Sequence, residues 1–514
     1  MPKPNVFTPN VRTPRGAPSA FLTVTLGLIL LVPSQFSTAE PLCQVPTVMH
    51  VHSTWSSGDL TLDMLIDRAR TTGVEAIFLT ENHLLRYEYG LPPLRHLLRY
   101  RVEYPSLLSR GPEGFLNAVR EANDRQKDVL LIPGAQVIPH YYWTGSLLGR
   151  TLAMHNTQKD ILALGLYRPE DYRDLPAVGN LGAGRWRAAS LWLLSPSVLA
   201  VPGIWLLRTG RRRVLHFRYF RVAFDRRFTG YGILCLVIST LLLANNFPFR
   251  LPPVSPYDPN AGLRPHQEVI DFVSSRGGAS AWSLPEARDH QVVTVAGMQA
   301  AFITEPYPSD LLHTDRFTAF GGLYEDTTTF THPGGGWDRL LADYLDGRRI
   351  APAWAIGEAS YHSEGEAGKR FGTIQTVFLV DRKTPLTMLE ALRSGRFYAL
   401  QKIPGAGLTL DQFQVFVPEQ PPAEAGDRIT LRRGTEPVVR AAIHATGGGQ
   451  IAIQALLVRN GIVVQTIHGE TPVTLRWHEP PLSAGAHLYY RLEVRSRGGY
   501  QILSNPIFLL TPQE

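Results

Sequence analysis

Histidines and carboxylates that could bind a metal ion and support hydrolysis gather in a few short stretches of the sequence. The candidates are His50, His52, Glu81, His83, Gln136, His140, His155, Asp160, Glu358 and His362. Imidazole and carboxylate together suit Zn, Mn or Fe, and such ions polarise an ester or phosphate and activate water. The spacing of His50 and His52 puts both imidazoles on one face of an extended chain, where they can share an ion. Each histidine taken alone has a second interpretation, as a hydrogen-bonded polar group at a strand end.

Strand-like runs come before most of these residues, and amphipathic helices separate the runs. The expected strands cover residues 47–51, 76–79, 129–132, 279–282 and 354–356, and the expected helices begin near residues 62, 112, 267, 337 and 386. In the first helix the apolar residues share one face, and Gly73 follows it as a typical C-terminal cap. Repeated strand–helix units predict a parallel sheet or barrel, whose strand C-termini collect the ligands.

Four of these stretches resemble the motifs of the PHP (polymerase and histidinol phosphatase) superfamily. The matching segments read His50-Val51-His52-Ser53, Phe78-Leu79-Thr80-Glu81-Asn82-His83, Ile132-Pro133-Gly134-Ala135-Gln136 and Ala355-Ile356-Gly357-Glu358-Ala359-Ser360-Tyr361-His362. Three further segments are similar to its carbaryl-hydrolase-type branch: Arg393-Ser394-Gly395-Arg396-Phe397-Tyr398, Tyr490-Arg491 and Ser504-Asn505-Pro506-Ile507. The resemblance implies an α/β fold with a distorted (β/α)7 barrel, followed by a small all-β sandwich. It also implies a di- or trinuclear metal site that hydrolyses phosphate or carboxyl-type esters.

The family's set of metal ligands is kept only in part. Asn82 stands where the family has Asp, Gln136 where it has Glu, and Asp160 where it has His; Ser283-Leu284-Pro285 replaces a His-Pro motif, and Ser360 replaces the Asp of the last motif. The resemblance leaves His50, His52, His83 and His362 as metal ligands, with Glu81 or Glu358 as general base. An amide cannot bridge two cations as a carboxylate does. We therefore expect one divalent ion (Zn, Mn or Fe) rather than three, with no bound metal as the alternative.

Two long uncharged stretches, residues 188–207 and 228–249, match the ~20 residues that a helix needs to cross a bilayer. The short segment between them is rich in arginine, which predicts that it stays in the cytoplasm. Residues 1–39 are typical of a signal peptide or N-terminal anchor. These features place the chain in the cell (inner) membrane, with its folded domains on the periplasmic or extracellular side. The alternative is a buried helical hairpin in a soluble core, and Pro196 and Pro202 interrupt the first stretch.

The formal net charge of +7 comes from the two segments tied to membrane topology. Residues 208–227 contain eight arginines and Asp225, a net +7, and residues 1–39 add +3, so the rest of the chain carries −3. The exported part is therefore slightly acidic, which gives no support to a nucleic-acid partner. The two cysteines cannot build a disulfide scaffold. The partners we expect are the lipid bilayer and a small-molecule substrate or ligand.

These features divide the chain into a barrel in two parts, residues 44–186 and 251–402, a transmembrane hairpin at 187–250 and a β-sandwich at 405–514. The first functional hypothesis is a membrane-anchored, exported metal-dependent hydrolase of ester or phosphoester bonds with a reduced metal site. The alternative is a catalytically inactive PHP-like scaffold that binds a ligand or serves envelope assembly. The aromatic triplet Tyr141-Tyr142-Trp143 either lines a substrate pocket or packs inside the barrel.

Overall fold

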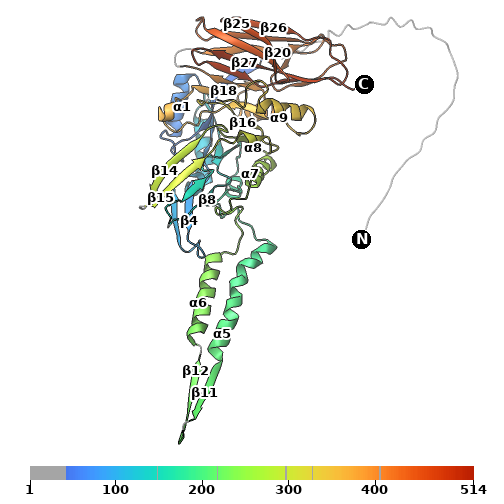
Figure 1. Cartoon of the computed structure of the whole chain (residues 1–514). Coiled ribbons are helices and arrows are strands. Elements are labelled where there is room, and N and C mark those ends of the chain that lie inside the picture. The colour runs from blue at the N-terminus through green and yellow to red at the C-terminus, as the bar shows by residue number, and fades with distance from the viewer. Residues whose placement is uncertain are drawn as a thin grey trace, which may run out of the picture. The chain divides into compact units, whose positions relative to one another are not determined.

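The computed structural model describes residues 42–147, 149–216, 218–227, 229–295, 298–326, 328–403 and 407–513. The expected signal peptide or anchor at residues 1–39 lies outside the described residues. Residues Leu42–Glu514 form one compact unit of mixed α/β structure. Figure 1 shows this unit coloured in chain order, from blue at its N-terminal end to red at the C-terminal strands.

A ring of strand pairings carries the polar residues singled out above. The strands are β1 (Cys43–Val51), β2 (Ala76–Leu79) with its continuation β3 (Glu81–Asn82), β6 (Leu130–Ile132) with its continuation β7 (Gly134–Val137), β10 (Ile161–Leu164), β13 (Ala279–Trp282), β16 (Ala319–Leu323) and β17 (Trp354–Gly357). Each pairs with the next in this order. The segment after β17 returns to β1, because Tyr361 N donates to His50 O and His52 N donates to Tyr361 O, both at 2.9 Å.

One strand of the ring departs from the expected parallel arrangement. β10 is antiparallel to both β7 and β13, whereas the other neighbours in the ring are parallel. The connection from β7 to β10 contains two strands, β8 (Tyr142–Thr144) and β9 (Ala153–His155), instead of a helix. Without a crossover helix to carry the chain back to its starting side, the next strand runs in the opposite direction.

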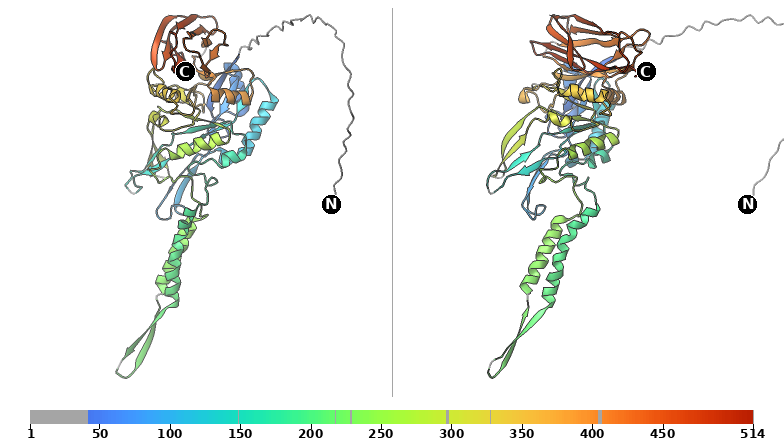
Figure 2. Two further views of the ribbon diagram at one scale, coloured as in Figure 1. Left: turned by 90° about the vertical axis from the view of Figure 1, so that its right-hand side faces the viewer. Right: turned by 45° about the vertical axis from the view of Figure 1, so that its right-hand side comes forward.

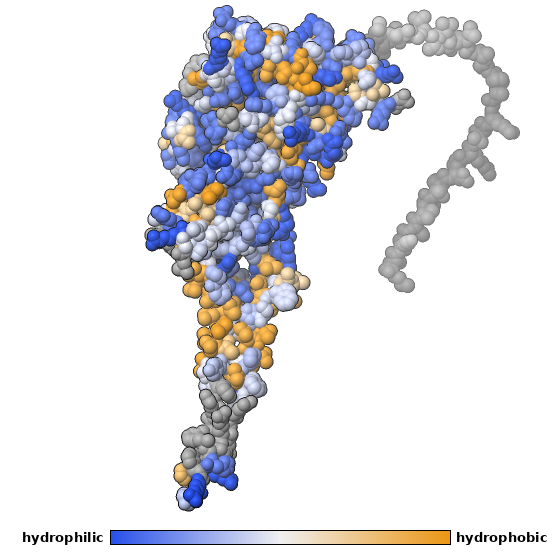
Figure 3. Space-filling view, viewed as in Figure 1, coloured by the Kyte–Doolittle hydropathy of each residue, from blue (hydrophilic) through white to orange (hydrophobic). Residues whose placement is uncertain are grey.

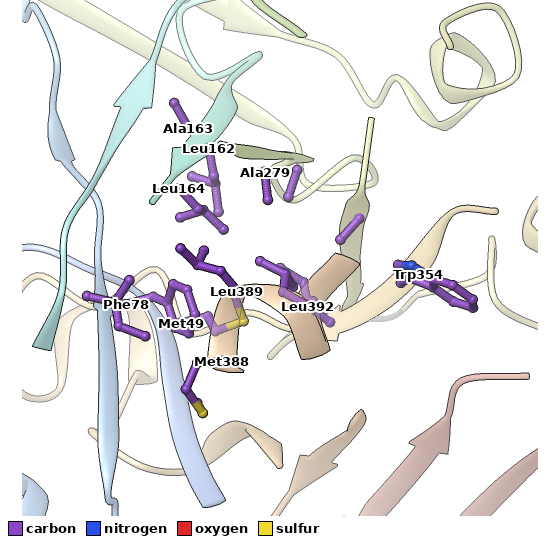
Figure 4. Packing of buried hydrophobic residues seen from close by; sticks show 14 of the residues in the cluster. Met49, Phe78, Leu162, Ala163, Leu164, Ala279, Trp354, Met388, Leu389 and Leu392 are labelled. Carbon is purple, nitrogen blue, oxygen red and sulfur yellow. The ribbon is translucent and has the colours of Figure 1, made fainter. Parts of the chain in front are cut away.

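The expected helices form and cover the strands. They are α1 (Leu62–Thr72), α3 (Pro112–Arg125), α7 (Arg264–Ser275), α9 (Gly336–Leu345) and α10 (Pro385–Ser394). In α1 the cap residue Thr61 accepts a hydrogen bond from Met64 N, and Gly73 ends the helix at a φ of 69°. α10 packs against the ring: Figure 4 shows Leu389 beside Leu164 of β10, and Leu392 near Ala279 of β13.

The C-terminal strands share a sheet with strands of this ring. β1 pairs with β18 (Ile374–Val380), β18 with β19 (Phe397–Gln401), and β19 with β28 (Gln501–Ser504), which pairs with β27 (His487–Ser496). The second layer consists of β20 (Leu408–Phe416), β23 (Val438–Ala445), β26 (Val473–His478) and the short β21 (Ala423–Glu424). A separate apolar core lies between the layers and includes Tyr398 of β19. One layer of the strands expected to form a sandwich at 405–514 therefore continues the sheet that contains β1, β18 and β19.

Two apolar helices lie between β10 and β13 in the chain. The first covers Ala188–Arg208 and the second, α6, covers Thr229–Asn246; both are long and apolar enough to cross a membrane. The first begins as a 3-10 helix, Ala188–Leu199, and continues as α5 (Ala200–Arg208), because Pro196 lacks the N–H that an α-helix needs. Most of each helix is exposed, which is unlike a core helix. Figure 3 shows apolar side chains covering this pair.

Close backbone contact holds these two helices together. A Cβ built at Gly232 would lie 2.9 Å from Gly203 O, so only glycine permits this approach. Ser239 Oγ donates to Pro196 O at 2.9 Å, and Asn246 Nδ2 donates to Leu193 O at 2.7 Å. The arginine-rich connection, expected as a loop, is instead a β-hairpin of β11 (Gly210–His216) and β12 (Arg221–Arg227). Figure 2 shows α5 and α6 side by side in both views, with this hairpin at their far end.

Candidate functional site

A buried carboxylate orients His50. The register of β1 shifts between Met49 and Val51, and His50 takes a φ of 65°, so the chain is not regularly extended at this residue. Its Nδ1 lies 2.6 Å from Glu358 Oε1. A carboxylate only accepts, so we assign the proton to Nδ1, which leaves the lone pair on Nε2. His50 Nε2 is buried and has no partner among the described residues.

Glu358 is held in place from a second side. Ser283 Oγ donates to Glu358 Oε1 at 2.5 Å, and Leu284 N donates to Oε2 at 3.0 Å. The Ser283 hydroxyl therefore helps to hold the Glu358 carboxylate in place. Leu284 has a φ of 40° and Ser360, two residues after Glu358, has a φ of 43°. Together with His50, these residues concentrate backbone strain around one carboxylate, which is typical of functional sites.

His52 is oriented through a serine by the second buried glutamate. Its Nδ1 lies 3.3 Å from Ser56 Oγ, which donates to Glu81 Oε2 at 2.5 Å. Ser53 supplies a second hydroxyl and its backbone N–H to the same carboxylate. Burial raises the pKa of Glu81 to about 7 and lowers the pKa of His52 well below its ordinary value. His52 Nε2 is also buried without a partner in the described part of the chain.

His362 contacts His52 face to face. The ring centroids are 4.0 Å apart and the planes differ by 10°. His362 Nδ1 lies 2.9 Å from Ser57 Oγ, which also accepts from Asn82 Nδ2 at 2.7 Å. Burial, and next the nearby His50, lower the pKa of His362 to about 3. An imidazole lone pair lies in the ring plane, so two stacked rings cannot both direct theirs at one ion in this arrangement.

His83 and Asp160 are buried and contact other protein groups. His83 Nε2 lies 2.6 Å from Tyr172 O, and burial lowers the pKa of His83 to about 4. Asp160 Oδ2 accepts from Gln136 Nε2 at 2.5 Å. Burial raises the pKa of Asp160 to about 8, which keeps its carboxyl protonated near neutral pH. Gln136 and Asp160 are thus hydrogen-bonded to each other.

The other histidines near these strands bind protein groups. His140 Nε2 lies 3.2 Å from Ser255 O, and His155 Nε2 lies 2.8 Å from Thr144 Oγ1 while its ring stacks on Tyr142. Within the described ranges, no group of three or more His, Cys, Asp or Glu side chains is placed to hold an ion. The structure therefore brings His50, His52 and His362 together, and it does not arrange them as a complete ligand set.

Sequence reasoning missed Lys369 and the serines after His52. The charge of Lys369 lowers the pKa of both His52 and His362, and its Nζ donates to Ser360 O at 3.0 Å. It lies in an irregular loop beyond the last motif, where no periodicity marks it. Ser53 and Ser56 directly follow His52, so their nearness was visible in the sequence, but their bonds to Glu81 require the folded chain.

Comparisons with known proteins give limited similarity. No family model matches this chain, and no curated protein matches it. A two-domain protein from Bacteroides vulgatus, described as containing a predicted PHP-like metal-dependent phosphoesterase, is 11% identical, with 88% of this chain and 90% of that one covered at a TM-score of 0.32. A putative metal-dependent phosphoesterase from Bifidobacterium adolescentis is 13% identical, with 65% and 92% covered at a TM-score of 0.27. TM-scores this low do not establish a common fold.

Proposed function

We propose that the chain is a membrane-anchored, exported PHP-like hydrolase of ester or phosphoester bonds with a reduced metal site. The observation that carries the proposal is the pair of buried, unpartnered Nε2 atoms of His50 and His52. Leaving a buried polar group unpaired costs about 1–3 kcal/mol, so a binding partner for these atoms would recover that cost. Each opposite nitrogen is fixed by a carboxylate, directly by Glu358 or through Ser56 by Glu81.

In this proposal His50 and His52 supply a partial site for one divalent ion, and the residues around them do not fit a multinuclear centre. A metal-binding histidine usually donates its other ring N–H to a carboxylate or a similar acceptor, as His50 does to Glu358. A bridging carboxylate is missing, because Gln136 is an amide and donates to the protonated Asp160. His50 and His52 would hold the ion, with water completing its shell, and His83 and His362 border the site.

The chemistry divides among a few residues. A bound Zn, Mn or Fe ion would polarise the scissile bond and make water more acidic. Glu81, with a pKa of about 7, suits a proton acceptor near neutral pH and is reached through the hydroxyl of Ser56. Glu358 instead positions His50. The Lys369 cation, whose Nζ donates to Ser360 O two residues before His362, favours an anionic substrate, such as a phosphoester or an ester that carries a carboxylate.

The two exposed apolar helices supply the membrane anchor in this proposal. The arginines at residues 208–227 keep the hairpin tip in the cytoplasm, so the strands on either side of the insertion fold outside. α6 spans about 27 Å at 1.5 Å per residue, close to the ~30 Å hydrocarbon core. A reporter enzyme fused at Arg213 is expected to behave as cytoplasmic. Periplasmic activity of that fusion would contradict the topology.

Metal content tests the hydrolase. The full chain, purified in detergent and loaded with Zn, Mn or Fe, is expected to retain about one equivalent, as a single mononuclear site requires. His50→Ala/His52→Ala should lose it together with hydrolysis of aryl phosphates and esters. His140→Ala/His155→Ala is the matched control, because both of these histidines already contact protein oxygens. Metal well below one equivalent that does not change in the double variant would contradict the proposal.

One observation favours the second candidate, an inactive PHP-like ligand-binding or envelope scaffold. Family ligand positions are closed by protein hydrogen bonds: Asn82 to Ser57, Gln136 to Asp160 and Ser283 to Glu358. An inactive scaffold would bind no stoichiometric metal, and its stability would be indifferent to chelators. The same metal measurement therefore separates the two candidates.

A further inference from the structure

An aromatic cavity of about 570 Å³ lies beside the site. Its ring-bearing lining residues are Tyr87, Tyr89, Tyr100, Tyr104, Trp143 and Phe302, contributed by β4 (Arg86–Gly90), β5 (Arg99–Glu103) and the residue after it, β8, and β15 (Met298–Thr304). This volume falls within the ~300–1,000 Å³ typical of small-molecule pockets. Of the aromatic triplet Tyr141-Tyr142-Trp143, Trp143 lines this cavity, whereas Tyr141 is buried in a neighbouring apolar cluster.

The aromatic part of this lining is pre-formed, and Thr157, Gln158, Asp289, Gln291 and Glu366 add polar groups to the rest of it. Tyr87 packs edge-on against Phe302, with centroids 5.6 Å apart and planes at 89°, and Tyr89 packs against Trp143 at 5.3 Å and 76°. Trp143 Nε1 donates to Glu88 O at 2.8 Å, which satisfies the polar edge of that ring. Side chains fixed in this way offer hydrocarbon surface to a ligand without further ordering.

Hydrogen bonds link the lining of this cavity to the proposed site. Tyr307 Oη donates to Gln158 O, which belongs to the lining, at 3.3 Å, and also to Ser283 O. Ser283 Oγ in turn donates to Glu358, the carboxylate that positions His50. Glu366, which also lines the cavity, follows His362 by four residues in the loop that leads to Lys369.

The same hairpin that lines the cavity also meets the apolar helices. His96 N and Leu97 N, in the turn between β4 and β5, donate to Asn245 Oδ1 near the end of α6 at 2.8 and 3.3 Å. Leu91, Leu97 and Leu98 in this turn are 45%, 46% and 53% exposed. Figure 1 shows β4 approaching the end of α6. Exposed leucines against a membrane-spanning helix are suited to the lipid surface.

We infer that the cavity binds the hydrocarbon tail of an amphiphilic, anionic ester taken from the bilayer, so that its head group reaches His50 and His52. The occupant is a lipid-like substrate, because one hairpin joins the exposed leucines at the helix end to the aromatic walls. Lys369 beside His362 complements the negative head group. The inference rests on the proposed function and narrows its substrate to long-chain phosphoesters or carboxyl esters.

Photo-crosslinking in lipid nanodiscs tests the tail site. Dodecyl phosphate with a terminal diazirine should label β4, β5 or β15 of the full chain in a saturable way, and unlabelled dodecyl phosphate should compete while butyl phosphate should not. Ala300→Trp fills the cavity from its lining and should reduce labelling about tenfold, or ~1.4 kcal/mol of binding. Phe302→Asp should act similarly. The matched control is Ile462→Asp on the exposed face of the sandwich, which should label normally.

The outcomes separate this inference from the proposed function. Labelling that persists in His50→Ala/His52→Ala supports the tail site whether or not the chain hydrolyses anything. Labelling confined to the apolar helices would overturn the inference. So would labelling that neither Ala300→Trp nor Phe302→Asp changes, provided that both variants unfold at the wild-type temperature. If short esters were still hydrolysed in that case, the proposed hydrolase function would stand and only the lipid-like substrate would be contradicted.

Discussion

His50 Nδ1 lies 2.6 Å from Glu358 Oε1 with both side chains fully buried, and His444 Nδ1 lies the same distance from Asp411 Oδ2 on the exposed surface of the sandwich. The two pairs have the same chemistry and differ in burial. In the buried pair the other ring nitrogen, His50 Nε2, is shielded from solvent and has no partner among the described atoms. The exposed pair His444–Asp411 therefore serves as a control for substitutions of Glu358.

Glu358→Gln is expected to weaken binding of the divalent ion by about 10–100-fold, because an amide no longer fixes the proton on His50 Nδ1. Zinc titration against a competing chelator measures the change. Asp411→Asn alters the exposed pair in the same way and should leave the affinity unchanged. An affinity in Glu358→Gln equal to that of the wild type would contradict the positioning role.

Gln136→Glu should make folding stability depend on metal. The new carboxylate would face Asp160 at the 2.5 Å contact now made by an amide, and two buried carboxylates need either a shared proton or a cation. Thermal unfolding with chelator should show a loss of about 1–3 kcal/mol, recovered when Zn or Mn is added. Gln414→Glu, beside Glu424 in the sandwich, is the control, and its stability should not respond to metal.

Asp160→Asn should flatten the pH dependence of stability. Burial raises the pKa of Asp160 to about 8 from an ordinary value of 3.8, so the folded chain keeps a proton that the unfolded chain has lost. This contribution is full below about pH 4 and is lost as the pH rises to about 8, with a slope of at most ~1.4 kcal/mol per unit. When unfolding is measured across this pH range in the presence of a chelator, the free energy of unfolding of the wild type should fall relative to that of Asp160→Asn. If the free energies of unfolding of the two proteins changed in parallel with pH, burial of this carboxyl would be contradicted. Asp124→Asn, at an exposed carboxylate, serves as the control.

Gly232→Leu should separate the two apolar helices. Its side chain would meet Gly203 O and Leu207 at about 3 Å, and such overpacking costs about 1–3 kcal/mol. Gly230→Leu lies two residues earlier in the same helix and has open space around it. Thermal unfolding in detergent should therefore report a lower midpoint for the first variant alone. Equal midpoints would mean that the helices do not pack through Gly203 and Gly232.

Asp338→Asn should weaken the junction between α9 and the sandwich. Arg491 of β27 is fully buried and donates to both oxygens of Asp338, which also accepts from Tyr489. Arg491 would keep only the more distant Glu493 carboxylate, at 3.8 Å, so the loss should approach that of a broken buried ion pair, about 3–5 kcal/mol. The comparison variant is Asp128→Asn, which breaks an exposed pair with Arg70 and should cost little. Similar losses in both variants would contradict the importance of the buried pair.

Much of the fold could be predicted because local patterns and tertiary packing agree. The apolar face of α1 and its end at Gly73 formed where the sequence predicted them. The C-terminal strands β28 and β29 (Ile507–Leu510) are separated at Asn505-Pro506. The Asn505 side chain bonds to Ala355 N and Phe397 O, contacts that no local pattern reveals.

The candidate site was predictable as a set of residues and not as a geometry. Placing His50, His52 and His362 near one another required only the strand order. The stacking of His52 on His362 and the left-handed backbone of His50 depend on the pairing of β1 with the segment after β17. Lys369 has no signature in the sequence, because its relevance comes from a loop that folds back over the histidines.

The sheet that runs from β6 through β1, β18 and β19 to β27 limits how this chain can be divided. A cut between β19 and β20 would remove β28 from its partner and leave the backbone of β19 as an open edge, which is prone to aggregation. The C-terminal strands are therefore not an interchangeable module. Any recombination that replaced them would have to reproduce the register in which Tyr398 faces Ser504, so both parts of the chain are constrained to be inherited together.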